Sequence, residues 1–224
     1  MATAYKVLKN TARAGNAIIG AGCYSAVLQH GNAYEGKVIK IANTTADPWL
    51  AFSHGIIVPM NTNCHTPEVS KVYIDHANEY YVANMEELDA ECYELDHYEF
   101  DRYDLADTIS ELIKGKMTQS EFEKYWKDFE CVLFPKGWNE FYKVADALID
   151  GTDCLTSDDE CCNEQPDEET RKLDIHAANI MFRRGCVVIT DPWCNLAVDD
   201  HPSMETWIEE SNDKNISENY YING

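Results

Sequence analysis

The chain has 224 residues, 45% of them apolar, and its 40 acidic and 18 basic residues give a formal net charge of −22. This balance argues against binding to nucleic acid or to an anionic membrane surface, because neutralising phosphates needs clustered Lys and Arg. No apolar run reaches the roughly 18 residues of a membrane-spanning helix, so no such helix is expected. The length suits one large domain or two small lobes that share a cleft.

The first third of the chain has the pattern of β-strands. Residues 17–30 and 35–42 are β-prone runs separated by the turn-like GNAY. Residues 68–74 and 79–85 form a second pair around DHAN. We therefore expect an antiparallel, β-rich N-terminal lobe over residues 1–88.

Residues 89–224 have the pattern of a mainly helical lobe. Thr118 and Glu121 make a capping-box pattern at the start of one helix. An acidic stretch, residues 151–170, is expected to be a solvated loop. Residues 47–56, in the first lobe, have the length of a single short helix. The helical periodicity rests on three apolar stripes: Leu105, Ile109, Leu112 and Ile113; Phe122, Trp126, Phe129 and Leu133; and Phe141, Ala145 and Leu148.

The cysteines and the first residues favour a reducing compartment. The start, MATAYKVLKN, lacks the apolar core of a secretory signal, so the nine cysteines are expected to be reduced thiols in a cytoplasm. No Cys-x-x-Cys pair occurs, and this absence disfavours a zinc site.

Two glycines and a lysine suggest a site for phosphate. Gly20 and Gly22 lie in GAGCYSAV between two expected strands, where the lack of a Cβ lets backbone N–H groups approach phosphate oxygens. Lys40 ends the run KVIK, and strand alternation places it on the same face as Val38. An apolar contact and a cation could therefore lie side by side, although hairpin glycines and a surface lysine are the simpler reading.

Two acids and an amide surround a short hairpin in LDIHAANIMFRRGCVVITDP. Asn179 and Asp191 stand at its two ends and offer the hard oxygen ligands that Mg²⁺ prefers. Asp174 would stand near them, able to accept a proton from a hydroxyl group. Turn capping by Asp and Asn is the simpler alternative for each residue alone.

The order of these motifs resembles the protein-kinase fold. DIHAAN, residues 174–179, is similar to the kinase catalytic loop in its Asp-Ile-His-x-x-Asn form. ITDP, residues 189–192, takes the place of the Asp-Phe-Gly segment, and VIK, residues 38–40, looks like the strand-three lysine motif. The nearer resemblance is to the serine/threonine protein kinases of short-tailed bacteriophages. It covers the glycine loop up to Lys40 and residues 173–193.

This resemblance implies a minimal bilobal protein-kinase-like α+β fold with ATP and Mg²⁺ as cofactors. It implies that Asp174 is the catalytic base or orients the substrate hydroxyl, and that Lys40 holds the nucleotide phosphates. Asn179 belongs to the catalytic set and binds Mg²⁺ together with Asp191. The other implied nucleotide contacts are Gly20, Gly22 and Tyr24, with Ser25 in the same loop; Val27, Val38 and Met181 around the adenine; and Glu86 to Leu88 along its edge.

The chain departs from common kinases where those enzymes are regulated. Lys172 and Leu173 stand in place of the usual His and Arg before the catalytic Asp. Pro192 follows Asp191 in place of Phe, and no Ala-Pro-Glu segment follows. Control by a phosphorylated activation loop is therefore not expected.

The usual partner of the strand lysine is also missing from the sequence pattern. Residues 47–56 contain no Glu to pair with Lys40. Glu68 and Asp75 lie on neighbouring expected strands, and the sequence does not choose between them.

The expected function is that of a phage-encoded, ATP- and Mg²⁺-dependent serine/threonine protein kinase. By resemblance, its substrates in the host cytoplasm are host bacterial proteins of transcription, RNA processing or antiphage defence. Autophosphorylation is expected, with Ser25, Thr152, Thr156 and Ser157 as candidate acceptors. One alternative is a small-molecule phosphotransferase like the aminoglycoside and choline kinases, which share the Asp-x-His-x-x-Asn loop. Another is a non-catalytic pseudokinase or acidic decoy that binds a host protein.

Overall fold

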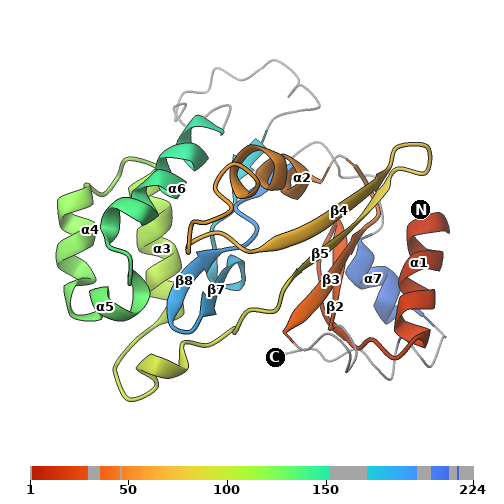
Figure 1. The fold of residues 1–224 in the computed structure, drawn as a ribbon, viewed down its shortest axis with the longest axis horizontal. Coiled ribbons are helices and arrows are strands. Elements are labelled where there is room, and N and C mark those ends of the chain that lie inside the picture. Colours follow the sequence, from red (N-terminus) through yellow and green to blue (C-terminus); the bar gives the residue numbers. More distant parts are fainter. Residues whose placement is uncertain are drawn as a thin grey trace. The chain divides into compact units, whose positions relative to one another are not determined.

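The computed structural model describes residues 2–29, 36–45, 47–151, 171–195, 203–211 and 216. It is a mixed α+β structure with an antiparallel five-stranded sheet, which confirms the α+β part of the prediction (Figure 1). The chain divides into two compact units. The sheet unit consists of residues 1–47, 68–87 and 199–224, and the helical unit consists of residues 48–67 and 88–198.

These units differ from the expected division at residue 88 in two ways. Residues 48–67 belong to the helical unit, although they were expected in the N-terminal lobe. The helix near the C-terminus belongs to the sheet unit. Both differences arise from packing between segments far apart in the sequence, which the local pattern does not report.

The sheet unit is built on five antiparallel strands in the spatial order β1-β2-β3-β5-β4. All four β-prone runs form strands. The strands are β1 (Ile18–Ala21), β2 (Ser25–Gln29), β3 (Lys37–Ala42), β4 (Val69–Asp75) and β5 (Tyr80–Glu86).

Two helices that the sequence reading did not predict cover one face of this sheet. Helix α1 (Ala2–Arg13) presents Leu8 and Ala12 to the sheet, and α7 (Met204–Glu209) presents Met204 and Ile208 (Figure 1). The buried cluster that they share with the strands consists of Ala4, Leu8, Ala12, Ile18, Ala26, Leu28, Ile41, Tyr80, Met204, Ile208 and Ile216.

The helical unit contains the three predicted helical regions. Its helices are α2 (Pro48–Phe52), α3 (Arg102–Ile113), α4 (Gln119–Tyr125), α5 (Glu130–Leu133) and α6 (Trp138–Asp150). A π-helical turn, Ser53–Ile57, continues α2. The predicted capping box at Thr118 and Glu121 is present at the start of α4.

The second apolar stripe does not form one helix as its spacing suggested. Helix α4 ends at Tyr125, and a 3-10 turn, Lys127–Phe129, separates it from α5. Phe122 and Phe134, on the two sides of the break, both pack on Phe141 in the core. The rings of Phe122 and Phe141 stack at 5.5 Å between centroids, and those of Phe134 and Phe141 meet edge to face at 5.1 Å.

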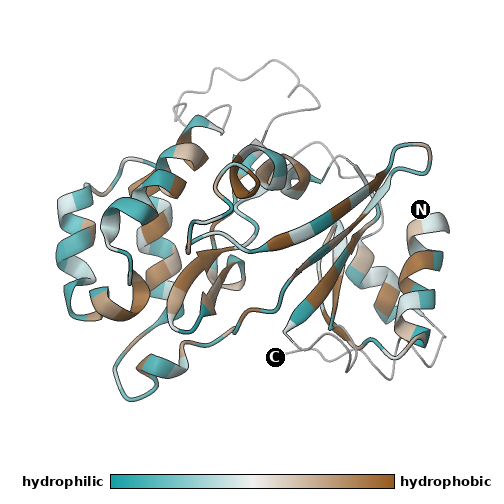
Figure 2. Ribbon diagram, viewed as in Figure 1, coloured by the Kyte–Doolittle hydropathy of each residue, from teal (hydrophilic) through white to brown (hydrophobic). Residues whose placement is uncertain are grey.

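The helical unit also contains four short strands. They are β6 (Arg171–Leu173), β7 (Ile180–Arg183), β8 (Cys186–Ile189) and β9 (Trp193–Asn195). Strands β7 and β8 form a hairpin, largely apolar in Figure 2, and β6 pairs with β9. Arg184 and Gly185 both have positive φ in the two-residue hairpin turn, and this geometry matches the right-handed strand twist. None of the helices in the described ranges is long and apolar enough to span a membrane.

Candidate functional site

Lys40 lies on the face of the sheet opposite to α1 and α7. Strand alternation turns Ile41 toward those helices and Val38 and Lys40 away from them. Val27 of β2 lies directly opposite Lys40, and Ala83 of β5 lies opposite it on the other side. Val27, Val38 and Lys40 therefore share one face, as the sequence predicted for Val38 and Lys40.

Lys40 pairs with an acid that the sequence reading missed. Its Nζ lies 4.0 Å from Oδ2 of Asp47, and both side chains are buried. The hydroxyl of the fully buried Tyr81, on β5, donates a short hydrogen bond of 2.5 Å to the same oxygen. Asp47 directly precedes α2. Asp47 is therefore the acid within residues 47–56 that pairs with Lys40, in place of the Glu that this segment lacks.

The two acids considered from the sequence have other roles. Oδ1 of Asp75 accepts hydrogen bonds from the backbone N–H groups of Ala77 and Asn78 in the turn between β4 and β5. The backbone N–H of Glu68 donates to the side chain of Glu86. Asp75 thus caps a turn, which is the ordinary role of Asp in such a position.

The glycine loop joins β1 to β2 and is fastened to α7. Gly22 N–H donates to Ser25 O at 2.9 Å and closes the turn. The carbonyl groups of Gly22 and Cys23 accept hydrogen bonds from the N–H groups of Glu205 and Met204, the first residues of α7. A Cβ at Gly20 or Gly22 would meet no described atom within 4 Å, so packing inside the protein does not explain either glycine.

The remaining residues expected near a nucleotide lie on both units. Tyr24 and Ser25 belong to the glycine loop and the start of β2, and Met181 lies on β7 opposite Val188. Glu86 ends β5, and its backbone N–H donates to Glu68 O. Leu88 is the first residue of the following segment in the helical unit.

Asp174, Asn179 and Asp191 are brought together within the helical unit. Asp174 N–H donates to the carbonyl oxygen of Pro192 at 2.7 Å, directly beside Asp191. Thr190 N–H, on the other side of Asp191, donates to Asn179 O at 3.0 Å. The chain from β6 to β9 thus folds the three predicted residues into one neighbourhood.

The side-chain amide of Asn179 is oriented by two acceptors. Its Nδ2 donates to the backbone oxygen of Asp174 at 2.7 Å and lies 3.0 Å from Nε2 of His176. This leaves Oδ1, the only metal-ligating atom of the amide, directed away from both acceptors. Nε2 of His176 also lies 3.7 Å from Oδ2 of Asp174, and both side chains are substantially exposed, at 53% and 43%.

The pKa of the thiol of Cys194, on β9, reflects the negative charge in this part of the helical unit. Burial raises the pKa of its thiol, and the carboxylates of Asp174 and Asp191 raise this pKa further. Lys172 opposes this shift. Both acids therefore act electrostatically on the region around Cys194, and their negative charges favour a cation there.

No protein-family model matches this sequence, and no curated protein matches it either. The function must therefore be argued from the residues and their geometry. Three proposed autophosphorylation sites, Thr152, Thr156 and Ser157, lie outside the described residues together with the rest of 152–170. Ser25 is described.

Proposed function

We propose that this chain is an ATP- and Mg²⁺-dependent serine/threonine protein kinase of a bacteriophage, with a minimal bilobal kinase-like fold. The observation that carries the proposal is the gathering of Asp174, Asn179 and Asp191 around the β7–β8 hairpin. In this proposal the sheet unit is the N-terminal lobe and the helical unit is the C-terminal lobe.

Each residue of this set has a role suited to its chemistry. Asn179 and Asp191 would supply oxygen ligands to Mg²⁺, which would neutralise charge on the phosphates. The exposed carboxylate of Asp174 accepts the proton of the substrate hydroxyl as that oxygen attacks the terminal phosphorus of ATP, and the bond from this phosphorus to ADP breaks so that ADP leaves. Phosphoryl transfer needs mainly positioning and charge stabilisation, so a short list of residues suffices.

The sheet unit supplies the groups that hold the nucleotide. Lys40 contacts the phosphates, and Asp47 replaces the missing Glu by fixing the position of the Lys40 ammonium group. Val27 and Val38 offer an apolar surface to the adenine on the same sheet face. The glycine loop, with Gly20, Gly22, Tyr24 and Ser25, covers the phosphates, and Met181 and the segment Glu86 to Leu88 complete the adenine contacts.

By the resemblance of the sequence motifs to those of phage serine/threonine protein kinases, the substrates are host bacterial proteins of transcription, RNA processing or antiphage defence. They are phosphorylated in the host cytoplasm during infection. The chain also phosphorylates itself, with Ser25 as the described candidate. No direct binding to nucleic acid or membrane is part of this function.

The test compares transfer of labelled γ-phosphate by the parent, Asp174→Asn and Asp107→Asn in a bacterial lysate with Mg²⁺. We expect Asp174→Asn to lose about 10²- to 10⁴-fold in rate, the usual contribution of a positioned general base. Asp107→Asn, which changes an exposed acid on α3, keeps the parent rate. Equal labelling by the parent and Asp174→Asn contradicts the proposal, and label found only in a metabolite favours a small-molecule kinase.

The metal role is tested separately by ATP binding. We expect ATP with Mg²⁺ to raise the thermal unfolding temperature of the parent, and EDTA to abolish most of this shift. Asp191→Ala removes a metal ligand and is expected to lose the Mg²⁺-dependent part. The same shift in parent and variant would favour a decoy that does not use the site.

A further inference from the structure

Two cysteines and a histidine, none of them assigned to phosphoryl transfer, lie together in the interior of the helical unit. Cys64 and His65 belong to the loop before β4, and Cys186 begins β8. One donor atom from each of these three side chains lies within 4.8 Å of the other two. Sγ of Cys186 is 3.7 Å from Nδ1 of His65, although the two residues are 121 positions apart.

The loop that carries Cys64 and His65 is held in one conformation by its own carbonyl groups. The five successive carbonyls from Thr62 to Thr66 each accept a hydrogen bond. Their donors are, in order, Lys136 Nζ, Thr66 Oγ1, Arg183 Nη1, Ile189 N and Arg183 Nη2. A loop fixed this densely holds its side chains in place before any ligand binds.

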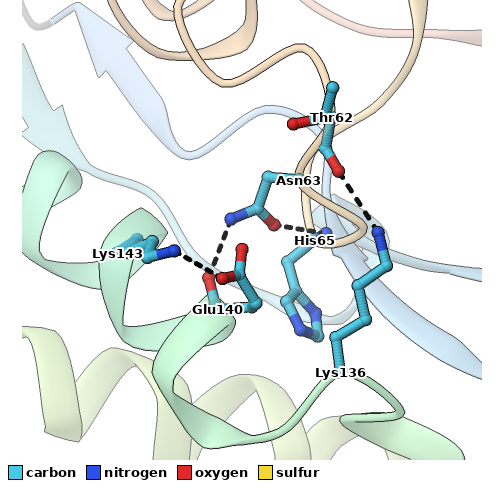
Figure 3. Close-up of polar contacts among 6 residues, drawn as sticks. All are labelled: Thr62, Asn63, His65, Lys136, Glu140 and Lys143. Carbon is cyan, nitrogen blue, oxygen red and sulfur yellow. Dashed lines mark hydrogen bonds and ion pairs between the residues drawn. The ribbon is translucent and has the colours of Figure 1, made fainter.

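Asn63 strengthens this arrangement from inside the loop. Figure 3 shows its side-chain amide between α6 and the backbone of His65: Nδ2 donates to Glu140 O at 2.8 Å, and Oδ1 accepts from His65 N at 2.8 Å. Lys136 reaches Thr62 O in the same view. Asn63 and Lys136 therefore fix the backbone that carries His65.

The imidazole of His65 has the hydrogen-bonding state of a metal ligand. Nδ1 lies 2.8 Å from the carbonyl oxygen of Val187, so Nδ1 carries the proton and donates it. Nε2 then holds a lone pair, and it is buried without a hydrogen-bond partner among the described atoms. Histidines that bind metals commonly donate their other ring N–H to such a carbonyl. An unsatisfied buried acceptor is otherwise unfavourable by about 1–3 kcal/mol.

The two cysteines lie where both sulfurs can reach one ion together with His65. Sγ of Cys186 lies 3.5 Å from the carbonyl oxygen of Cys64 and 3.7 Å from Nδ1 of His65. A bound cation would hold both sulfurs as thiolates.

We propose that Cys64, His65 and Cys186 bind one Zn²⁺ ion that fastens the loop 62–66 to strand β8. In tetrahedral coordination at about 2.3 Å for sulfur and 2.0 Å for nitrogen, ligand atoms lie roughly 3.5–3.8 Å apart, so shifts of about 1 Å complete the site. Ligation through Nε2 keeps the bond to Val187, and ligation through Nδ1 replaces it. Two thiolates neutralise the ion, which suits a buried position, and a water molecule takes the fourth place.

This site is independent of the proposed kinase function. Strand β8 runs from Cys186, beside the hairpin turn, to Ile189, so the ion would stiffen the turn end of the hairpin without contacting a nucleotide. The zinc site that the sequence disfavoured becomes possible because the fold joins cysteines from distant segments.

The test uses the full chain with Cys154, Cys161 and Cys162 changed to Ser, so that cysteines in the acidic segment cannot bind metal. The protein is stripped with chelator under a phosphine reductant and titrated with Zn²⁺ against a chromophoric chelator. Cys64→Ser and Cys186→Ser are compared with Cys131→Ser, which alters an exposed cysteine elsewhere in the helical unit. Circular dichroism without metal establishes that each variant is folded.

We expect one Zn²⁺ per chain in the parent background and in Cys131→Ser, and affinity at least about 100-fold lower in Cys64→Ser and Cys186→Ser. Changes to residues that only orient the ligands lower metal affinity by about 10- to 100-fold. Co²⁺ provides a readout that needs no variant, because tetrahedral sulfur ligation gives thiolate-to-metal charge transfer and intense visible bands. Stoichiometry equal in all four proteins, or a Co²⁺ spectrum without charge transfer, overturns the proposal. A Cys64–Cys186 disulfide in the isolated protein, with no Zn²⁺ uptake after reduction, does so as well.

Discussion

The two units hold their candidate residues in opposite ways. In the sheet unit, Lys40 and Asp47 have only 6% and 2% of their side chains exposed, and the buried Tyr81 donates a hydrogen bond to Asp47. In the helical unit, Asp174 and His176 keep about half of their side chains exposed, and backbone hydrogen bonds set their positions. A buried ion pair is fixed by its own packing, whereas an exposed carboxylate depends on the loop that carries it.

This contrast determines what mutation can reveal in each unit. Removing one partner of a buried ion pair leaves an uncompensated charge and destabilises the fold. Replacing an exposed acid usually changes stability by no more than about 0.5 kcal/mol. Loss of activity is therefore separable from loss of folding at Asp174, and it is confounded with folding at Lys40 unless stability is measured as well.

The largest effect is expected from Lys40→Met. This variant removes the buried ammonium group that lies 4.0 Å from Oδ2 of Asp47, and the expected loss is about 3–5 kcal/mol in the free energy of unfolding. Urea unfolding followed by circular dichroism measures this loss. The double variant Lys40→Met with Asp47→Leu removes both charges and is expected to recover most of it. A loss below about 1 kcal/mol in the single variant would show that folding does not depend on the buried ion pair, and the two units would then not differ in this respect.

The sequence predicted the part of the sheet unit that depends on local pattern. Strand alternation placed Val38 and Lys40 on one face, and the register confirms this. Asp47 was missed, because the usual partner of the strand lysine is a Glu within a helix, whereas Asp47 directly precedes α2 and is also held by a hydrogen bond from Tyr81. Helix α1 did leave a signal, since Leu8 and Ala12 are four residues apart, but the strand-rich pattern that follows drew the interpretation away from it.

In the helical unit, the sequence predicted those features whose residues lie close together along the chain. Asp174, Asn179 and Asp191 fall within one short stretch, so a single hairpin was enough to bring them together. Cys64 and Cys186 carry no such signal, because no local spacing links residues joined only by the folded loop. The break between α4 and α5 was also missed, since the stripe continues through Phe129 while the helix does not.

A medium effect is expected from Gly151→Ala, at the end of α6. A Cβ there would lie 2.5 Å from Cζ2 of Trp193, whose ring packs edge to face on Phe52. Trp193 cannot move freely because it is buried and pairs with Leu173, so the expected loss is about 1–3 kcal/mol. Urea unfolding followed by tryptophan fluorescence measures it.

The same variant sharpens the contrast, because it tests whether the exposed acids depend on buried packing beneath them. Asp174 N–H is bonded to Pro192 O, directly before Trp193, so phosphoryl transfer is expected to fall by about 10²-fold. Gly55→Ala is the matched control in the same unit, since a Cβ there meets no described atom within 4 Å. If Gly151→Ala had the stability and the phosphoryl-transfer rate of the parent, the ring of Trp193 would be able to move aside without disturbing the acids.

The smallest effect is expected at the exposed capping box of α4, where polar contacts lie fully at the surface. Thr118→Val removes the hydroxyl that accepts a hydrogen bond from Glu121 N–H, and the usual loss for such a cap is about 1 kcal/mol. Glu121 accepts in return from the hydroxyl and the N–H of Thr118, and these bonds lower the pKa of its carboxyl.

The sign of the pH dependence at Glu121 follows from that direction. A carboxyl with a lower pKa in the folded state stabilises the protein above its unfolded pKa, and this stabilisation is lost as the pH falls through the folded value. The stability difference between the parent and Glu121→Gln is therefore expected at neutral pH and should vanish on acidification. In the Thr118→Val background the same difference should shrink, because the hydroxyl is the main cause of the lowered pKa. If the stability difference between the parent and Glu121→Gln persisted unchanged at acidic pH, the carboxylate would not act through this cap. Packing of the side chain, rather than its hydrogen bonds, would then determine the effect even at this exposed position.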